Sequence, residues 1–111
     1  MKNLLKETID CLIKNSKQLS DVFWVGMLGY DYDKHKQFCY KNTWGYFCSK
    51  ADFTYNDGFG GVEIDMGLIV VGKDFWLERH EYDGSEWWEF KSIPMEPEET
   101  IEFDLRADYS L

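Results

Sequence analysis

Long apolar runs are missing from this sequence of 111 residues. The longest run, MGLIVVG at residues 66–72, falls far short of the roughly 20 apolar residues that span a bilayer, and it suits a buried strand. At the N-terminus, Glu7 and Asp10 interrupt the apolar stretch that a signal peptide would need. We therefore expect a cytoplasmic protein that has no membrane partner.

Cysteine pairs are also missing. Cys11, Cys39 and Cys48 are odd in number and form no C-x-x-C motif. We expect free buried thiols, as is usual in a reducing compartment. A disulfide between Cys39 and Cys48 stays open as an alternative, although nothing else in the sequence requires it.

Positive charge is the third shortage. The chain has 12 Lys and Arg against 21 Asp and Glu, which gives a net charge of −9. Nucleic acid and anionic membranes are recognised by cationic surfaces, so we expect neither as a partner. A basic protein surface suits this charge, because complementary fields steer association. The acidity also has a simpler explanation, which is solubility.

The usual signatures of catalysis and phosphate binding are absent as well. The glycine-rich stretch at 56–61 matches no phosphate-binding loop, and its glycines suit turns. Asp31, Asp33 and His35 alternate like metal ligands, but they match no EF-hand, and a solvated loop explains them equally well. With only one further histidine, His80, nucleophilic catalysis has few bases. We expect no catalytic residue, metal site or cofactor.

The residues that are present predict an α+β fold in a single globular domain, 1–111. Apolar residues three to five apart predict a helix over 3–18. β-Branched and aromatic residues predict a strand over 21–28, followed by a polar turn. A helical apolar spacing over 42–51 favours a short second helix, although its glycine and aromatic residues weaken that assignment.

The second half of the sequence predicts three strands within residues 66–92. Gly72-Lys73 separates the first two, and Asp83-Gly84 marks a tight hairpin between the second and third. These features predict an N-terminal helix packed on a mostly antiparallel sheet.

The C-terminal segment predicts one more strand. Pro94 and Pro97 end the preceding sheet. Residues 100–107, TIEFDLRA, then alternate apolar with charged side chains, which is typical of a half-buried strand.

The Asp83-Gly84 turn also predicts which side chains share a face, because residues directly opposite each other in a hairpin do so. One face should carry Trp76 opposite Lys91, Glu78 opposite Glu89, and His80 opposite Trp87. The other should carry the apolar core residues Phe75, Leu77, Trp88 and Phe90, with Arg79 opposite Trp88.

The first of these faces has a candidate site. A Gly72-Lys73 turn would place Gly67 opposite Glu78 and leave space above it. Glu78, His80 and Glu89 would then line a small pocket between Trp76 and Trp87, with Lys91 nearby. Such a group suits a divalent metal, a cationic ligand or acid–base chemistry, whereas the alternative is a solvated sheet face.

Residues 89–91 also have the E-x-K form of some metal-dependent nucleases. Three letters recur by chance, however, and the acidic charge argues against a DNA substrate.

Aromatic residues are in surplus, with five Trp, seven Tyr and eight Phe. Trp87 and Trp88 must point to opposite faces of one strand, so one of them is exposed unless both faces are covered. Exposed tryptophan beside acidic residues is typical of a protein-binding surface.

The run VVGKDFWLERHEYDGSEWWEFKSIP at residues 70–94, preceded by a GG-x-E element at Gly60, Gly61 and Glu63, resembles the signature of a family of small uncharacterised bacterial proteins. The resemblance covers about the last half of the chain. It implies a bacterial, cytosolic origin and no particular activity.

Two functional hypotheses follow. The first is a small acidic protein-binding or regulatory domain that recognises a basic protein, as an inhibitor or immunity protein does. The alternative is a ligand- or metal-binding domain, or an enzyme, that uses Glu78, His80 and Glu89.

Overall fold

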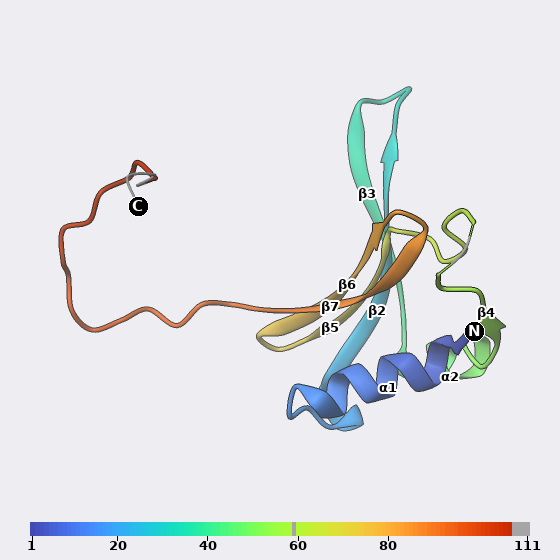
Figure 1. Cartoon of the computed structure of the whole chain (residues 1–111). Helices are drawn as coiled ribbons and strands as arrows, with labels where there is room; N and C mark the ends of the chain where they lie inside the picture. The colour runs from blue at the N-terminus through green and yellow to red at the C-terminus, as the bar shows by residue number, and fades with distance from the viewer. Residues whose placement is uncertain (59, 108–111) are drawn as a thin grey trace.

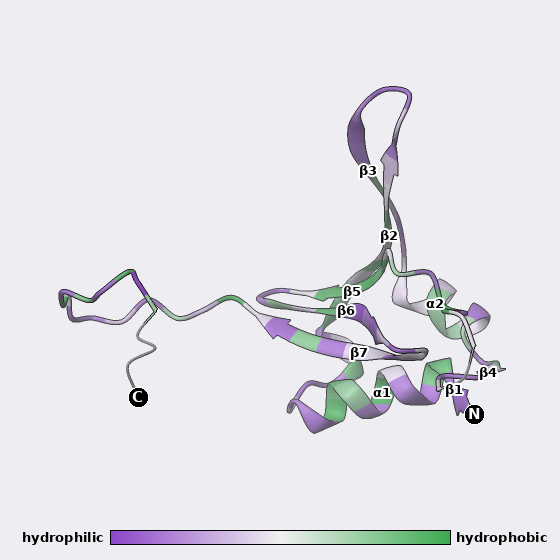
Figure 2. Ribbon diagram, turned by 45° about the horizontal axis from the view of Figure 1, so that its top comes forward, coloured by the Kyte–Doolittle hydropathy of each residue, from purple (hydrophilic) through white to green (hydrophobic). Residues whose placement is uncertain are grey.

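A computed structural model describes residues 1–58 and 60–107 as an α+β fold (Figure 1). A five-stranded antiparallel sheet has the strand order β3-β2-β5-β6-β7. Its strands are β2 (Val22–Asp31), β3 (Lys36–Asn42), β5 (Leu68–Gly72), β6 (Phe75–Tyr82) and β7 (Ser85–Ser92). Helices α1 (Leu4–Lys14) and α2 (Trp44–Lys50) lie on the same side of it (Figure 2), which we call the helix face. The opposite side is the outer face.

Helix α1 begins at a side-chain cap and ends at a left-handed residue. The Asn3 side chain accepts a hydrogen bond from the Lys6 N–H at 2.9 Å. Ser16, two residues past the helix, has a φ of 61°. The predicted helix is therefore confirmed but ends at Lys14 rather than at residue 18. A short 3₁₀ turn, η1 (Leu19–Asp21), leads into β2.

Helix α2 confirms the predicted short second helix. Thr43 caps its start by accepting the Tyr46 N–H at 3.1 Å. Its Phe47 is buried in the core, and this contact explains why the helix forms despite Gly45.

Strands β2 and β3 form a long hairpin that projects beyond the rest of the sheet (Figure 1). The predicted strand over 21–28 is confirmed, but it runs on to Asp31, so most of the predicted polar turn is strand. Gly29 permits this, because a Cβ there would lie 2.1 Å from Cζ of Phe38. The Asp31 carboxylate accepts the backbone N–H groups of Asp33 and Lys34, at 3.0 and 3.2 Å, and so closes the turn.

The turn between β5 and β6 differs from the prediction. Val70 lies opposite Leu77, and Ile69 rather than Gly67 lies opposite Glu78. The register is displaced by two residues, so each side chain keeps its predicted face. Gly72 belongs to the strand because the Phe75 ring packs over it, where a Cβ would come within 2.1 Å of the ring.

Gly67 is consequently not opposite Glu78, and the predicted space above that glutamate is absent. Gly67 lies against β2 instead, where its carbonyl accepts the Leu28 N–H at 2.7 Å. The apolar pattern determined the faces correctly, but it could not distinguish registers two residues apart.

The core lies between the helix face and the two helices. A small second sheet, not predicted, pairs β1 (Lys2–Asn3) with β4 (Thr54–Tyr55) beside the start of α1. The buried hydrophobic residues are Leu4, Leu12, Val25, Phe47, Ala51, Tyr55, Ile64, Val70, Phe75, Leu77 and Trp88. The three cysteines are free, as predicted, but none is fully buried and Cys39 is exposed.

The predicted strand over 100–107 is wrong. Residues 93–107 belong to no helix or strand and run away from the sheet (Figure 1). Phe103 is 77% exposed and Leu105 is 88% exposed. Alternation alone does not make a strand, because a strand needs a partner edge, and the two prolines turn this segment away from its own sheet.

Within the described ranges, 1–58 and 60–107, no helix has the length and apolar content needed to cross a membrane.

The close approach at Gly67 predicts a stability effect. In Gly67→Ala the new Cβ would lie 2.0 Å from the Leu28 carbonyl oxygen, which is backbone and cannot swing aside. We expect the free energy of unfolding, measured in urea, to fall by about 1–3 kcal/mol. The control is Gly58→Ala, where a Cβ meets nothing within 4 Å. Equal stability of the two variants would contradict this account of the β2–β5 contact.

Candidate functional site

The predicted register of the β6–β7 hairpin is confirmed. Glu78 lies opposite Glu89 and His80 lies opposite Trp87. The turn between the strands has positive φ at both central residues, 49° at Asp83 and 85° at Gly84. This is the turn geometry that matches the twist of the flanking strands, so the Asp-Gly pair determines the register.

A repeated motif runs along both strands of the outer face. On β6, the Trp76 indole donates to Glu78 Oε1 at 2.7 Å, and Glu78 Oε2 lies 2.8 Å from His80 Nε2. The motif on β7 is looser: the Trp87 indole donates to Glu89 Oε1 at 3.5 Å, and Glu89 Oε2 lies 3.7 Å from a lysine, Lys91. Because the strands are antiparallel, the two W-x-E-x-base runs are related by an approximate twofold axis at the Glu78–Glu89 pair.

This motif explains how two glutamates tolerate direct opposition. Like charges facing each other destabilise a sheet, but each carboxylate here has an indole donor and a basic side chain on its own strand. The Trp76 hydrogen bond, followed by His80, lowers the pKa of the Glu78 carboxyl below its ordinary value. Both glutamates are about one-third exposed, so these pairs orient the side chains more than they stabilise the fold.

The predicted three-residue pocket is not formed. The structure brings Glu78 and His80 together, whereas Glu89 engages Trp87 and Lys91. Ile69 fills the position opposite Glu78 that the prediction gave to Gly67. Over the part of the chain that the structure describes, no three His, Cys, Asp or Glu side chains are grouped so as to hold a metal ion.

A row of apolar side chains, two of them tryptophans, lies beside the glutamates on the outer face. Trp24 of β2 is level with Val71 of β5, and Val71 is level with Trp76 of β6. A shallow depression of about 400 Å³ adjoins the row and is lined mainly by Trp24, Leu28, Met66, Ile69, Val71 and Trp76. The outer face is therefore an apolar strip bordered by Glu78 and Glu89, not a polar pocket.

The tryptophan pair on β7 divides between the two faces as predicted. Trp88 is buried on the helix face, where its indole donates to Thr8 Oγ1 of α1 at 2.8 Å. Trp87 is half-buried on the outer face, with its ring stacked on His80 at 6.5 Å between centroids. Trp24 and Trp76 are also half-buried, so the outer face keeps three tryptophans in contact with solvent.

Sequence reasoning missed a buried ion cluster on the helix face. Arg79 Nη2 donates to Glu86 Oε1 at 3.1 Å, and both side chains are fully buried. Arg79 also donates to the Tyr55 hydroxyl at 3.0 Å and to Glu7 Oε1 at 3.3 Å. The guanidinium lies 4.9 Å from the centre of the Trp88 ring. A signal was present, since Arg79 and Glu86 alternate with apolar residues on the face predicted to be core.

The partners of this cluster are all internal, which indicates a structural role. The Glu86 carboxylate accepts the backbone N–H groups of Glu63 and Ile64 at 2.7 and 3.0 Å. Its own N–H donates to the Asp57 carbonyl at 2.8 Å. Glu86 thus fastens the glycine-rich loop to β7. The GG-x-E element contributes through both parts of Glu63: its backbone N–H donates to Glu86, and its carboxylate accepts the Asn56 N–H at 2.6 Å.

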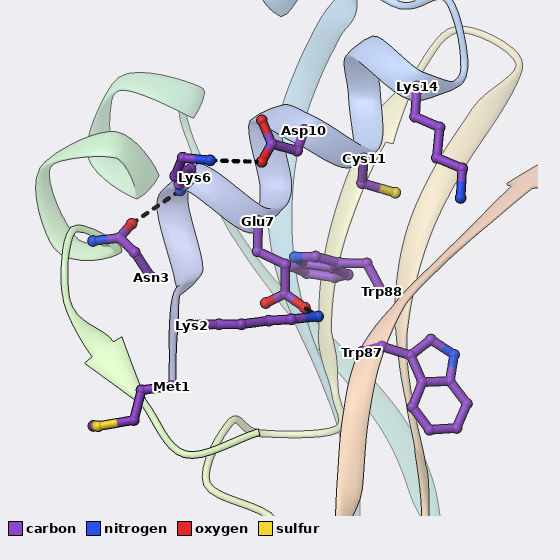
Figure 3. A pocket seen from close by; sticks show the side chains of 10 residues that line it. All are labelled: Met1, Lys2, Asn3, Lys6, Glu7, Asp10, Cys11, Lys14, Trp87 and Trp88. Atoms are coloured by element: carbon purple, nitrogen blue, oxygen red, sulfur yellow. Dashed lines mark hydrogen bonds and ion pairs between the residues drawn. The ribbon is translucent and has the colours of Figure 1, made fainter. Parts of the chain in front are cut away.

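A groove of about 480 Å³ runs between α1 and β7 (Figure 3). Four of its five charged side chains pair with one another: Lys6 lies 3.2 Å from Asp10, and Lys2 lies 3.7 Å from Glu7. Figure 3 shows Trp88 turned under the helix and Trp87 turned away from it. Because most of its charges are paired, the groove does not indicate a particular ligand.

Comparisons of the chain with protein-family models, with curated proteins and with solved structures found no match. The resemblance of residues 70–94 to a bacterial family therefore stays a prediction.

The buried ion cluster predicts a large effect of Arg79→Met. The substitution leaves Glu86 and Glu7 buried without their cation, so we expect a loss of about 3–5 kcal/mol in the free energy of unfolding. Lys91→Met is the control, because its partner Glu89 is partly solvated and its removal should cost less than about 1 kcal/mol. Denaturant titration measures both. A loss for Arg79→Met as small as that of the control would contradict the structural role.

Tyr55 predicts a pH effect at the alkaline end. Burial and its hydrogen bond to Glu7 raise the pKa of the Tyr55 hydroxyl above its ordinary value. The neutral Tyr55 hydroxyl therefore contributes its full stabilisation of the folded chain below about pH 10, where an unfolded tyrosine is still neutral. This contribution is lost as the pH rises further. Above that pH, the unfolding free energy of Tyr55→Phe should fall less steeply than that of the unsubstituted chain, by up to about 1.4 kcal/mol per pH unit.

The control for this prediction is Tyr32→Phe, because Tyr32 is exposed. Its pH dependence should match that of the unsubstituted chain. Equal slopes for Tyr55→Phe and Tyr32→Phe would show that the Tyr55 hydroxyl ionises as readily in the folded as in the unfolded chain.

Proposed function

We propose that this chain is a small protein-binding or regulatory domain, of the inhibitor or immunity-like kind, whose outer face recognises a basic protein surface. One observation carries the proposal. The row of Trp24, Val71 and Trp76 lies on the face opposite both described helices, next to two partly exposed glutamates. Apolar rows with an acidic border are the arrangement expected of an interface core and its rim.

The tryptophans of this face are pre-ordered for binding. The Trp76 indole is held by Glu78 at 2.7 Å, and the Trp24 ring lies against Gly26, where a Cβ would come within 2.4 Å of it. Side chains that are already fixed lose less entropy when a partner covers them. Trp is also the residue type most enriched among those that dominate binding energy, so this row is the expected centre of the interface.

The negative charge of the chain and of its outer face favours a positively charged partner. The chain carries a net charge of −9, and the border of the row supplies Glu78 and Glu89. A basic protein would approach faster and with a strong dependence on salt, whereas nucleic acid would be repelled. The free cysteines, with Cys39 exposed, suit a reducing compartment, and we propose the cytoplasm as the location.

The experiment reverses charge on the outer face alone. The double variant Glu78→Lys/Glu89→Lys changes the net charge from −9 to −9 + 4 = −5. The immobilised chain is presented to a bacterial extract at low salt, and any saturable basic binder is quantified. We expect this variant to lose that binder, and Trp76→Ala to weaken its binding by about 2 kcal/mol or more, roughly thirtyfold.

The matched control is Glu96→Lys/Glu98→Lys, which has the same net charge but alters exposed residues beyond β7. This control should keep the binder, and circular dichroism should show both double variants folded. Equal loss in the two variants would mean that net charge alone governs binding. Full retention by the outer-face variant would place the interface elsewhere, and either result contradicts the proposal.

A further inference from the structure

Residues 100–106 have the pattern of a strand, but within the described part of the chain they pair with no edge of their own sheet. Residues 100–106 alternate Ile101, Phe103 and Leu105 with charged side chains, and all three apolar residues are more than three-quarters exposed. A segment with this alternating pattern can be completed as a strand by adding to the edge of another sheet.

Strand β3 offers such an edge. It pairs with β2 on one side only, and six of its seven residues are exposed. Lys36 and Lys41 are its charged residues, and it has no acid, which is unusual in a chain of net charge −9. Residues 93–107 carry five acids and one base, so the two segments are complementary in charge.

We propose that residues 100–106 of one copy of this chain add as an antiparallel strand to β3 of a second copy, with Phe103 opposite Tyr40 and Glu102 opposite Lys41. Each segment is seven residues long. The exchange is reciprocal, because each copy offers its β3 edge and its own residues 100–106, and it closes a twofold dimer.

The register follows from which side chains share a face. Phe103 opposite Tyr40 places Leu105 opposite Phe38 and Ile101 opposite Asn42, all on the helix face. A groove of about 430 Å³ on that side is lined in part by Tyr40, Asn42, Tyr46 and Phe53, so it adjoins Ile101 and Phe103. A slip of one residue would instead place Glu102 and Asp104 over this apolar side.

The other edge of the sheet is less suitable. At the start of β7, the Glu86 N–H already donates to the Asp57 carbonyl. Glu89 lies on the outer face of β7 and would repel the acidic segment. Two features of β3, its free edge and its lysines, therefore select it over β7.

The geometry of the tail favours a second copy over the same chain. Pro94 and Pro97 lie between β7 and the segment, which leads away from the sheet (Figure 1). Strands β7 and β3 are the two opposite edges of the sheet, four strand spacings or roughly 19 Å apart. A chain leaving β7 would have to cross a whole face of its own sheet to reach β3.

The test is a disulfide that only the proposed register permits. Asp104 would lie directly opposite Cys39, a free and exposed thiol, so Asp104→Cys should cross-link to Cys39 of a second copy under mild oxidation. Leu105→Cys is the matched control, because its side chain points to the other face. We expect a covalent dimer to form at least about tenfold faster with Asp104→Cys than with Leu105→Cys, and Cys39→Ser to abolish it.

A second measurement needs no cysteine. Sedimentation of the unsubstituted full-length chain should show a concentration-dependent dimer, and Phe103→Asp should be monomeric with an unchanged circular dichroism spectrum. Four results would each overturn the proposal: a monomeric unsubstituted chain, a dimer that survives Phe103→Asp, equal cross-linking of the two cysteine variants, or a disulfide of Asp104→Cys that forms within one chain. The outer-face variants Glu78→Lys/Glu89→Lys should still dimerise, which separates this test from that of the proposed function.

Discussion

The contact between Arg79 and Glu86 organises this fold more than any other interaction. The pair lies diagonally across the β6–β7 hairpin, and its remaining hydrogen bonds reach Glu7 in α1, Tyr55 in β4 and the backbone of the glycine-rich loop. Three regions distant in sequence, at residue 7, at residues 55–64 and at residues 79–86, therefore meet at two side chains. A buried ion pair rarely adds much net stability compared with a pair of apolar side chains, but removing either partner leaves a buried charge unpaired. Its effect is to specify one arrangement of helix, loop and hairpin.

Side chains alternate between the two faces of a strand, so the β6–β7 hairpin contributes to the core on one face and to the solvent-facing surface on the other. Arg79 and Trp88 point into the core, whereas their neighbours Glu78 and Trp87 point outward. The Asp83-Gly84 turn fixes that division, since a shift by a single residue would expose the ion pair and bury the outer glutamates. The buried side of the hairpin thus fixes the orientation of the outer side, where the Trp76 and Trp87 indoles each donate to a glutamate two residues away.

Local signals were predictable, and non-local ones were not. The α+β class, the two helices and the β6–β7 register follow from apolar spacing and one turn dipeptide. The β5–β6 register did not follow, because a two-residue displacement preserves every face and only the packing of Phe75 over Gly72 distinguishes the choices. The Arg79–Glu86 pair was hidden because directly opposite residues were considered and diagonal ones were not. The candidate pocket failed with the register, since Ile69 occupies the space that the prediction gave to Gly67.

The two surfaces proposed for association differ in what organises them. On the outer face, Trp76 and Trp87 already donate to glutamates of their own strands. A partner must therefore match the shape and charge of a surface whose side chains are already ordered. At β3 and residues 100–106, the unpaired groups are backbone, and complementarity is achieved by continuing the sheet. A strand needs an edge as well as a pattern, and residues 100–106 have the pattern without an edge in their own sheet. The same alternation that failed to predict a strand within the chain is therefore the main argument for one between chains.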